Sequence, residues 1–266
     1  TTVSDAARLL EVIAGPDRHD ATTLDAPPID VAAAGDIRGK VIGLPDEYFT
    51  DDLDPGIRAA CNRAVERFQS LGAVVRKVSL PHTKYAVPAY YIVNPAEAAA
   101  NLARYDGVRY GARKQGDGGD VSSLYRATRG EGFGPEVKRR ILVGTFVLSA
   151  GYADQFYARA QVVRHRIVDD FTQVFASGVD LLFTPTTPST AFRAGEKLDD
   201  PVQMYLADVF VAPASLAGIP AMSVPIGRSD GLPVGGQLIA PALGEQSMIG
   251  AALALEAAID ATAEVR

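Results

Sequence analysis

A strand–helix–strand pattern constrains the fold of this chain more than any other feature. Residues 40–44 (KVIGL) and 73–78 (AVVRKV) are short apolar runs, and the segment up to Leu71 between them has helical spacing. Asp54 and Pro55 supply an N-cap and a first-turn proline for that helix. Two neighbouring parallel strands need a connection of a dozen or more residues, and a helix is the usual one. The helix between these two strands therefore predicts that they pair in parallel. The pattern therefore predicts the α/β class.

The rest of the chain adds further strands and helices to this unit. Ser4 precedes a short apolar helix that Gly15 can end, and residues 114–120 have the glycine-rich composition of a loop. Together the pattern predicts a layered mixed sheet flanked by helices. The further strands are expected at 179–184, 221–226 and 234–240. The further helices are expected at 95–105 and 135–148, both opened by proline, and at 153–176 and 245–258.

Composition restricts the class of partner. The chain has 266 residues, a net charge of −6 and a pI near 5.1. This negative net charge argues against a protein that binds nucleic acid through its overall electrostatic attraction, although Lys138, Arg139 and Arg140 could form a local basic patch. No apolar run approaches the roughly 18 residues of a membrane span, and no signal-peptide pattern opens the chain. A single cysteine, Cys61, excludes an internal disulfide framework, so we expect a cytoplasmic protein without membrane contact.

Candidate binding groups crowd into residues 81–111 and 131–141, where aromatic and charged residues follow no clear amphipathic period. A nucleophile motif is missing: the sequence contains no Gly-x-Ser-x-Gly turn, no P-loop and no metal-ligand pair. The histidines, His19, His82 and His165, are too scattered for a metal site, and His82 is interpreted as a hydrogen-bonded structural residue. We therefore expect neither a metal nor a cofactor in this chain.

Five successive segments resemble one family, in order and over nearly the whole chain. They are LPHTKYAVPAYYIVNPAEAAANLARYDGVRYG, TRGEGFGPEVKRRILVGTFVLSAGY, AFRAGEKLDDPVQMYLADVF, LAGIPAMSVPIG and GLPVGGQLIAP. These segments are similar to the A subunits of the glutamyl-tRNA(Gln)/aspartyl-tRNA(Asn) amidotransferases, which are amidase-signature enzymes. The resemblance implies the amidase-signature fold for this chain.

The function that the resemblance implies is that of a glutaminase, which releases ammonia from glutamine. The ammonia passes to a partner subunit, where ATP, with Mg²⁺, activates the carboxylate of a misacylated tRNA for amidation. The implied assembly is a heterotrimer with B and C subunits. The misacylated tRNA, Glu-tRNA(Gln) or Asp-tRNA(Asn), is contacted mainly by the partner, and ATP and Mg²⁺ also belong to that partner.

The chain departs from this family in one respect. The family's catalytic set is a Ser nucleophile, a cis-Ser and a Lys in a Gly/Ser-rich region upstream of the segment that matches TTVSDAARLL, and no such run occurs in this sequence. In that set a neutral lysine takes a proton from the bridging serine, and backbone amides hold the oxyanion. We expect residues 1–266 to be the C-terminal portion of a single amidase-signature domain whose upstream catalytic part is absent. Such a portion is expected to be inactive and poorly soluble alone.

The family's substrate contacts fall, by position in the matching segments, on Tyr90, Arg140 and Asp208. Free glutamine carries a carboxylate and an ammonium group. Arg140 can donate two hydrogen bonds to the carboxylate, and the Asp208 carboxylate can accept a hydrogen bond from the ammonium group. Each residue also has an ordinary structural interpretation. Arg140 could lie on a solvated helix face, Asp208 could cap a helix over VFVAPASLAG, and Tyr90 or its neighbour Tyr91 could be a core aromatic.

Three functions remain open at this point. The first is the glutaminase component of a tRNA-dependent amidotransferase. The second is a stand-alone amidase-signature hydrolase of a small amide, which the same fold would serve. The third is a noncatalytic fragment or binding module, which would hydrolyse no amide under any condition. Binding of free glutamine separates the first from the second.

Overall fold

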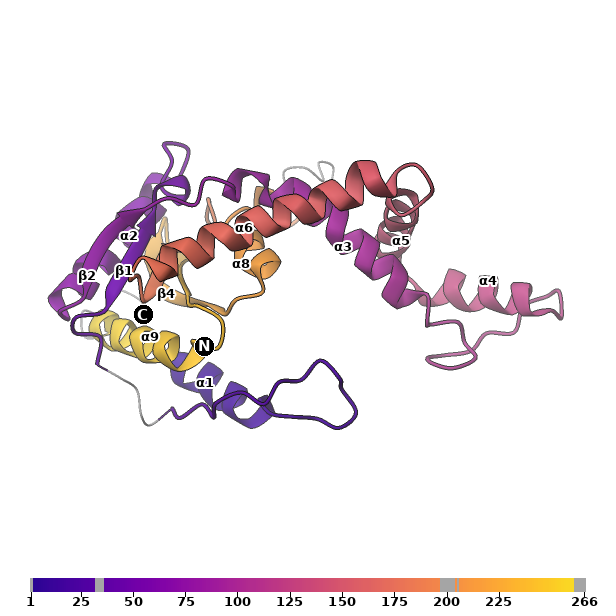
Figure 1. Cartoon of the computed structure of the whole chain (residues 1–266), viewed down its shortest axis with the longest axis horizontal. Coiled ribbons are helices and arrows are strands. Elements are labelled where there is room, and N and C mark those ends of the chain that lie inside the picture. The colour runs from indigo at the N-terminus through magenta and orange to yellow at the C-terminus, as the bar shows by residue number, and fades with distance from the viewer. Residues whose placement is uncertain (1, 32–35, 197–203, 205, 261–266) are drawn as a thin grey trace. The chain divides into compact units, whose positions relative to one another are not determined.

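The chain folds into two compact units. The computed structural model describes residues 2–31, 36–196, 204 and 206–260 (Figure 1). The sheet unit comprises residues 1–87 and 166–266, and the helical unit comprises residues 88–165. Helices α3 (Ala86–Leu102) and α6 (Ala158–Ala176) carry the chain from one unit to the other.

Five strands form a mixed sheet in the sheet unit. They are β1 (Val41–Pro45), β2 (Val74–Val78), β3 (Leu181–Pro185), β4 (Ala221–Ser229) and β5 (Leu232–Ile239). The strand order is β2-β1-β3-β5-β4. β1 is parallel to β2 and β3, whereas β5 is antiparallel to β3 and β4. Among the described residues, β4 pairs on one side only, with β5.

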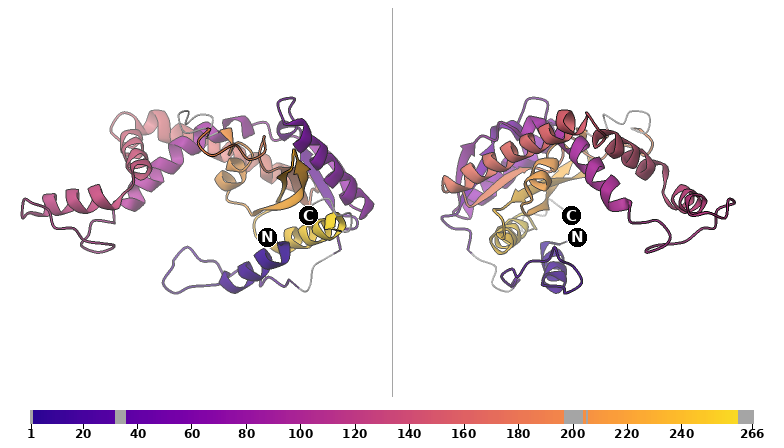
Figure 2. Two further views of the ribbon diagram at one scale, coloured as in Figure 1. Left: turned by 180° about the vertical axis from the view of Figure 1, so that it is seen from behind. Right: turned by 45° about the vertical axis from the view of Figure 1, so that its right-hand side comes forward.

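Helices cover the apolar strands at the centre of this sheet. The helices α2 (Pro55–Ser70) and α9 (Glu245–Asp260) pack against strands and against each other. Figures 1 and 2 show α1 (Val3–Ile13) beside α9. The buried ring of Phe68 in α2 meets that of Phe183 in β3 edge-on, with centroids 5.4 Å apart. Burying such a side chain stabilises the fold by roughly 1.5–3 kcal/mol.

The strand–helix–strand prediction is confirmed. β1 and β2 are parallel and α2 joins them. The carboxylate of Asp54 accepts hydrogen bonds from the backbone amides of Gly56 (2.8 Å) and Ile57 (3.0 Å), and Pro55 occupies the first turn of the helix. The three other predicted strands and the last helix are also found, with bounds that agree or differ by up to three residues. The predicted α/β class with a mixed sheet is therefore correct.

The helical unit contains α4 (Val121–Gly132), α5 (Pro135–Val147) and most of α3. α5 begins at a proline as predicted. Its Gly144 lies directly against α3, since a Cβ atom at this position would collide with the backbone carbonyl of Pro95. The close approach of α3 and α5 therefore depends on a residue without a side chain.

The predicted start of a helix at Pro95 is wrong. α3 begins at Ala86, so Pro95 lies inside it. A proline inside a helix lacks one N–H group and crowds the preceding turn, at a cost of about 3 kcal/mol. Ala89, Val93 and Ala96 are buried along the same helix, as is Pro95 itself. This packing offsets the cost, which a rule based on local sequence does not include.

Other helix boundaries also differ from the predicted ones. α1 begins at Val3 rather than after Ser4, because the hydroxyl of Thr2 accepts a hydrogen bond from the Asp5 amide at 3.1 Å and caps the helix. The segment predicted as one helix over 153–176 starts with a π-helical turn, η3 (Ala153–Tyr157), and continues as α6.

Several short elements were not predicted. They include α4, α8 (Ala212–Ala217) and the 3₁₀ turns η1 (Asp46–Tyr48) and η2 (Thr83–Tyr85). The start of α4 did carry a signal, since the Asp120 carboxylate accepts a hydrogen bond from the Ser123 amide at 2.7 Å. Within the described ranges, no helix has both the length and the apolar character that a membrane span requires.

Candidate functional site

Two of the three predicted contact residues come together in the helical unit. Tyr90 on α3 accepts a hydrogen bond from the Asn94 amide nitrogen at 3.1 Å, one helical turn away. Arg140 on α5 donates from its Nε to Oε1 of Glu136 at 2.9 Å, again one turn away. An interaction between Tyr90 and Arg140 joins the two pairs. We call these four residues the Arg140 cluster.

The Arg140 cluster holds a fixed cation at a partly exposed position. The hydrogen bond to Glu136 raises the pKa of the Arg140 guanidinium above its ordinary value, and the contact with Tyr90 acts in the same direction. In return, the hydrogen bond from Arg140 lowers the pKa of the Glu136 carboxyl. The Arg140 side chain is 36% exposed, so the guanidinium is within reach of a ligand.

Asp208, the third predicted residue, belongs to the sheet unit. Its side chain is exposed in the segment before α8. The alternative interpretation of Asp208 as a helix cap is wrong, because α8 begins at Ala212 with Val211 as its N-cap and without a side-chain cap. The backbone carbonyl of Asp208, not its carboxylate, accepts from the amides of Val211 (3.1 Å) and Ala212 (3.0 Å). With the described residues the exposed Asp208 carboxylate forms no hydrogen bond or ion pair, so it can take another contact.

The turn that carries Asp208 is attached to the sheet. We call residues 206–211 the Asp208 turn. The carbonyl oxygen of Phe210 accepts a hydrogen bond from Nε2 of Gln237 in β5 at 3.0 Å. The buried ring of Phe210 lies against the ring of Tyr48, with centroids 5.1 Å apart and planes inclined by 30°. The Asp208 turn thus has a polar and an apolar anchor.

A cleft of about 350 Å³ lies beside the Asp208 turn. Its polar groups come from β4, β5, α8 and Thr186, which follows β3, and the hydroxyls of Thr186 and Ser223 are 2.9 Å apart in it. Gly235 keeps this pair in place, since a Cβ there would come within 2.7 Å of the Ser223 hydroxyl. The lining residues are Thr186, Val211, Ala214, Ser215, Ile219, Ala221, Met222, Ser223 and Gln237.

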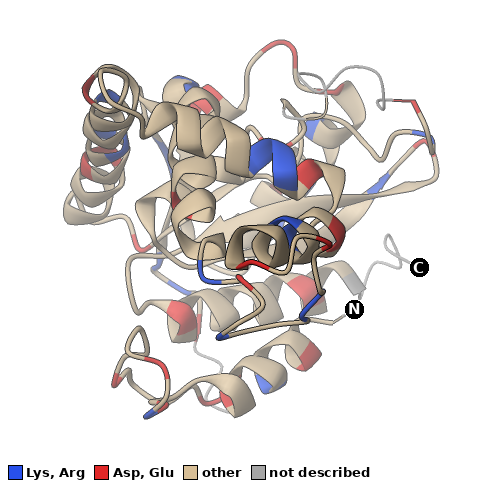
Figure 3. Cartoon of the chain, turned by 90° about the vertical axis from the view of Figure 1, so that its right-hand side faces the viewer, with Lys and Arg blue, Asp and Glu red and all other residues tan. Residues whose placement is uncertain are grey.

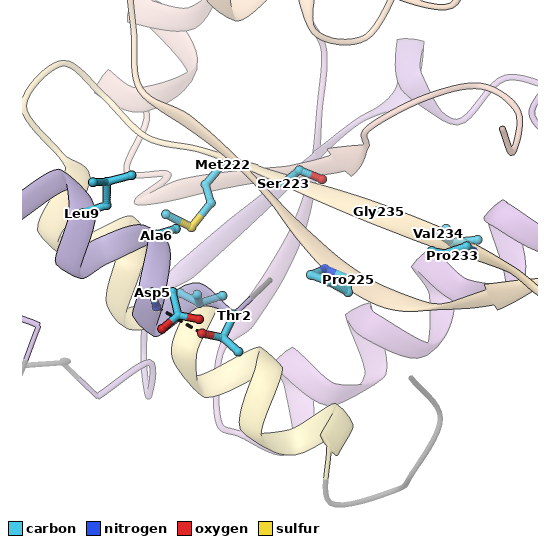
Figure 4. A pocket seen from close by; sticks show the side chains of 11 residues that line it. Thr2, Asp5, Ala6, Leu9, Met222, Ser223, Pro225, Pro233, Val234 and Gly235 are labelled. Atoms are coloured by element: carbon cyan, nitrogen blue, oxygen red, sulfur yellow. Dashed lines mark hydrogen bonds between the residues drawn. The ribbon is translucent and has the colours of Figure 1, made fainter. Parts of the chain in front are cut away.

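A larger cleft of about 630 Å³ lies between α1 and the strands β4 and β5. Figure 4 shows Ala6 and Leu9 of α1 on one side and Met222 of β4 on the other. Asp5 is the single ionisable residue among those that line it, and the Asp5 backbone amide bonds to the Thr2 hydroxyl of the helix cap. This cleft therefore brings together no groups that could transfer a proton or bind a zwitterion.

Other residues singled out in the sequence have structural roles. Nδ1 of His82 lies 2.8 Å from the Asp170 carboxylate, which also accepts from the His82 amide at 2.8 Å. This confirms the interpretation of His82 as a hydrogen-bonded structural residue. Cys61 is buried in α2, and burial raises the pKa of its thiol to about 12.

Lys138, Arg139 and Arg140, the basic residues singled out in the sequence, each have a partner in the helical unit. In Figure 3, basic and acidic residues are interspersed along the helices. Arg139 and Arg140 share Glu136, and Lys138 donates to the backbone carbonyl of Gly130. Within the described part of the chain, no three His, Cys, Asp or Glu side chains are placed so that they could hold a metal ion.

Three residues of these arrangements were not predicted. Glu136 and Asn94 stand four residues from Arg140 and Tyr90, a spacing that puts side chains on one helix face and was available in the sequence. Gln237 had a weaker signal, a lone polar residue in the apolar run GGQLIA. Its partners lie 27 and 53 residues away, so no local pattern could identify them.

Comparison with known proteins places this architecture among amidases. The family model described as Amidase matches residues 1–249. The glutamyl-tRNA(Gln) amidotransferase A subunit of Zymomonas mobilis is 52% identical over 258 residues, and that of Chloroflexus aggregans is 54% identical over 250 residues. The matches cover 96% and 93% of this chain, and 52% and 51% of the two relatives. The chain therefore spans about half the length of the curated relatives it matches.

Solved structures support the same fold. The crystal structure of the glutamyl-tRNA(Gln) amidotransferase A subunit from Thermotoga maritima has a TM-score of 0.71 and 37% identity, covering 95% of this chain and 50% of that one. A bacterial aryl acylamidase of the amidase-signature family has a TM-score of 0.73 and 26% identity, covering 99% and 53%. The predicted amidase-signature fold is confirmed by these similarities.

Proposed function

The chain belongs to the amidase family, and we propose that it is the glutamine-recognising part of the glutaminase component of a tRNA-dependent amidotransferase. The complete glutaminase releases ammonia from glutamine, and a partner that uses ATP and Mg²⁺ transfers this ammonia to Glu-tRNA(Gln) or Asp-tRNA(Asn). The B and C subunits complete the assembly in the cytoplasm. The names of the relatives at 52–54% identity support this proposal over a stand-alone hydrolase of small amides.

The observation that carries the proposal is the Arg140 cluster. A ligand carboxylate needs a cation that is held in one orientation, and Glu136 holds Arg140 through Nε at 2.9 Å. Because Glu136 occupies Nε, N–H groups on the Nη atoms remain for hydrogen bonds to a ligand carboxylate. Tyr90 supplies a hydroxyl at the same place. Asp208, with its exposed carboxylate, is the acceptor proposed for the ammonium group of glutamine.

The chemistry itself is proposed to take place in the part of the glutaminase that this chain does not span. The sequence of this chain contains no Gly/Ser-rich run that could supply the serines and lysine of an amidase-signature set. Arg140 and Asp208 are each proposed to contact glutamine, while the nucleophile comes from elsewhere in the glutaminase. Amide hydrolysis by residues 1–266 alone would contradict this division.

The experiment that tests the proposal is a glutaminase assay on the full-length protein with its partners. Arg140→Ala should raise KM for glutamine about 10- to 100-fold, because a hydrogen bond to a charged group contributes about 1.5–3 kcal/mol. Lys138→Ala is the matched control, since Lys138 lies on the same helix and donates to the Gly130 carbonyl. An unchanged KM in Arg140→Ala, or efficient hydrolysis of simple amides without a preference for glutamine, would overturn the proposal.

A further inference from the structure

A buried glutamine in β5 has no role in the substrate contacts proposed above. Gln237 is 3% exposed and lies between the buried residues Gly236 and Leu238. A carboxamide in such a place is unfavourable unless its polar atoms are hydrogen-bonded, so a hydrophobic residue would be the ordinary choice for the core. The position of Gln237 therefore requires a reason beyond packing.

The hydrogen bonds of Gln237 connect the sheet to the Asp208 turn. Its Nε2 donates to the carbonyl oxygen of Phe210 at 3.0 Å and to Oγ1 of Thr184 in β3 at 3.0 Å. β5 has a neighbouring strand on each side, so the donor is fixed by the sheet itself. An amide nitrogen carries two hydrogens, and these two bonds use both. The side chain thus forms a bridge of defined length between the sheet and the turn.

The bridge acts close to the proposed acceptor for glutamine. Phe210 is two residues from Asp208, and its ring is held against Tyr48 at 5.1 Å. The Asp208 carbonyl closes the turn with Val211 and Ala212. The residues that follow Asp208 are therefore held by the bond to Gln237, by the ring contact with Tyr48 and by the hydrogen bonds within the turn. The Asp208 carboxylate itself is exposed. A binding group must be held to within a fraction of an ångström, and this arrangement provides that restraint.

We propose that Gln237 is a positioning residue that fixes the Asp208 carboxylate for the ammonium group of glutamine. This inference rests on the proposed function. Without the bond to Phe210, the turn keeps its ring contact and its internal hydrogen bonds but loses the hydrogen bond that ties its backbone to the sheet. The carboxylate then no longer meets the ammonium group in one geometry, and affinity for ligands that carry this group falls.

The experiment compares two ligands on the full-length protein with its partners. Glutaramate is glutamine without the α-ammonium group, so the ratio of the two dissociation constants reports on the Asp208 contact alone. Gln237→Met keeps the length and burial of the side chain but has no donor. We expect it to reduce the preference for glutamine over glutaramate about tenfold, with glutaramate binding unchanged within about twofold. An equal loss for both ligands, or no loss, would overturn the inference.

Two further variants keep the result interpretable. Ser223 stands opposite Gln237 in the β4–β5 register, and Ser223→Ala should leave the preference unchanged because the bond to Phe210 stays intact. Gln237→Leu also removes the donor at a similar side-chain volume, so it should lose the preference for glutamine as Gln237→Met does. A preference that is kept in Gln237→Leu would overturn the inference.

Asp208→Asn separates the inference from the function on which it rests. If the unmodified protein shows no preference for glutamine, or if Asp208→Asn leaves that preference intact, the proposed role of Asp208 fails and the inference fails with it. If Asp208→Asn abolishes the preference and Gln237→Met retains it, only the inference is overturned. Thermal unfolding of each variant checks that it is folded at the temperature of the binding measurement.

Discussion

The Arg140 cluster and the Asp208 turn present opposite charges by different structural means. In the Arg140 cluster, Tyr90 and Arg140 each have a partner one helical turn away on the same helix, and one further interaction joins the two residues. In the Asp208 turn, the anchors come from β5 and from η1, far away in sequence, and both are buried. The first arrangement is local and partly exposed, whereas the second depends on the core of the sheet unit.

This contrast indicates where each region should be sensitive to substitution. Exposed ion pairs contribute little free energy, typically about 0–1 kcal/mol, because water and salt screen them. Buried anchors contribute more, because their loss leaves a cavity or an unsatisfied polar group. Substitutions of the buried anchors of the Asp208 turn should therefore lower the free energy of unfolding. Single substitutions in the Arg140 cluster should instead weaken glutamine binding, with little effect on the free energy of unfolding.

Phe210→Ala should produce the largest effect. Removing a buried aromatic ring typically costs about 3–5 kcal/mol, and here the contact with Tyr48 is lost as well. The free energy of unfolding from urea titration measures this cost. Leu206→Ala is the matched control in the same turn, because Leu206 is 52% exposed and its truncation should cost less than about 0.5 kcal/mol. Equal effects of the two variants would show that Phe210 does not anchor the turn.

Gly144→Ala should be the most damaging change in the helical unit. The new methyl group collides with the Pro95 carbonyl, so α3 and α5 must separate. Overpacking of this kind costs about 1–3 kcal/mol and should also raise KM for glutamine, since Tyr90 and Arg140 lie on these two helices. Thermal unfolding and glutaminase kinetics measure the two consequences.

The control for Gly144→Ala is Gly130→Ala in α4. A Cβ at Gly130 meets no atom within 4 Å, so the substitution should stabilise the helix by up to about 1 kcal/mol. If both alanine variants are more stable than the unmodified protein to the same extent, the close approach of α3 and α5 does not require a glycine at position 144.

Cys61 should give the sheet unit a measurable pH dependence. Burial raises the pKa of the folded thiol from 9.0 to about 12, so the unfolded chain loses its proton first as the pH rises. The contribution to stability is present below pH 9 and should fall by about 1.4 kcal/mol by pH 10. Denaturation of Cys61→Ala at the same pH values is the reference, because this variant should lack the dependence. A thiol reagent should label Cys61 only when the chain unfolds.

Glu136→Gln should have the smallest effect. It weakens the restraint on Arg140, and the loss of an exposed pair should raise KM for glutamine by less than about fivefold, with kcat unchanged. Because the pKa of Glu136 is lowered in the folded state, its contribution is present above the ordinary carboxyl pKa and is lost as the pH falls through the lowered value. Glu131→Gln, which breaks the pair with Lys114 at 3.2 Å, should leave KM unchanged at every pH. A large effect of Glu136→Gln on stability would remove the contrast with the Asp208 turn.

Much of the fold could be predicted because its signals are local. The apolar runs of β1 and β2, with Asp54 and Pro55 at the start of α2, specify a parallel strand–helix–strand unit through periodicity and capping. The pairing of Arg140 with Glu136 also follows from spacing on one helix, although it was not predicted. In each case the interacting groups lie within one turn or one element of each other.

Contacts between distant parts of the chain account for what could not be predicted. Pro95 lies inside α3 because the helix buries its apolar side chains, and Asp208 fails to cap α8 because its backbone carbonyl closes the turn instead. Gln237 reaches Phe210 only after β5 has taken its place between β3 and β4. The sequence alone therefore specified the elements and the residue types available for binding. The free energy of burial and of long-range hydrogen bonds, which no local pattern encodes, determines where helices begin and which side chains hold the Asp208 turn.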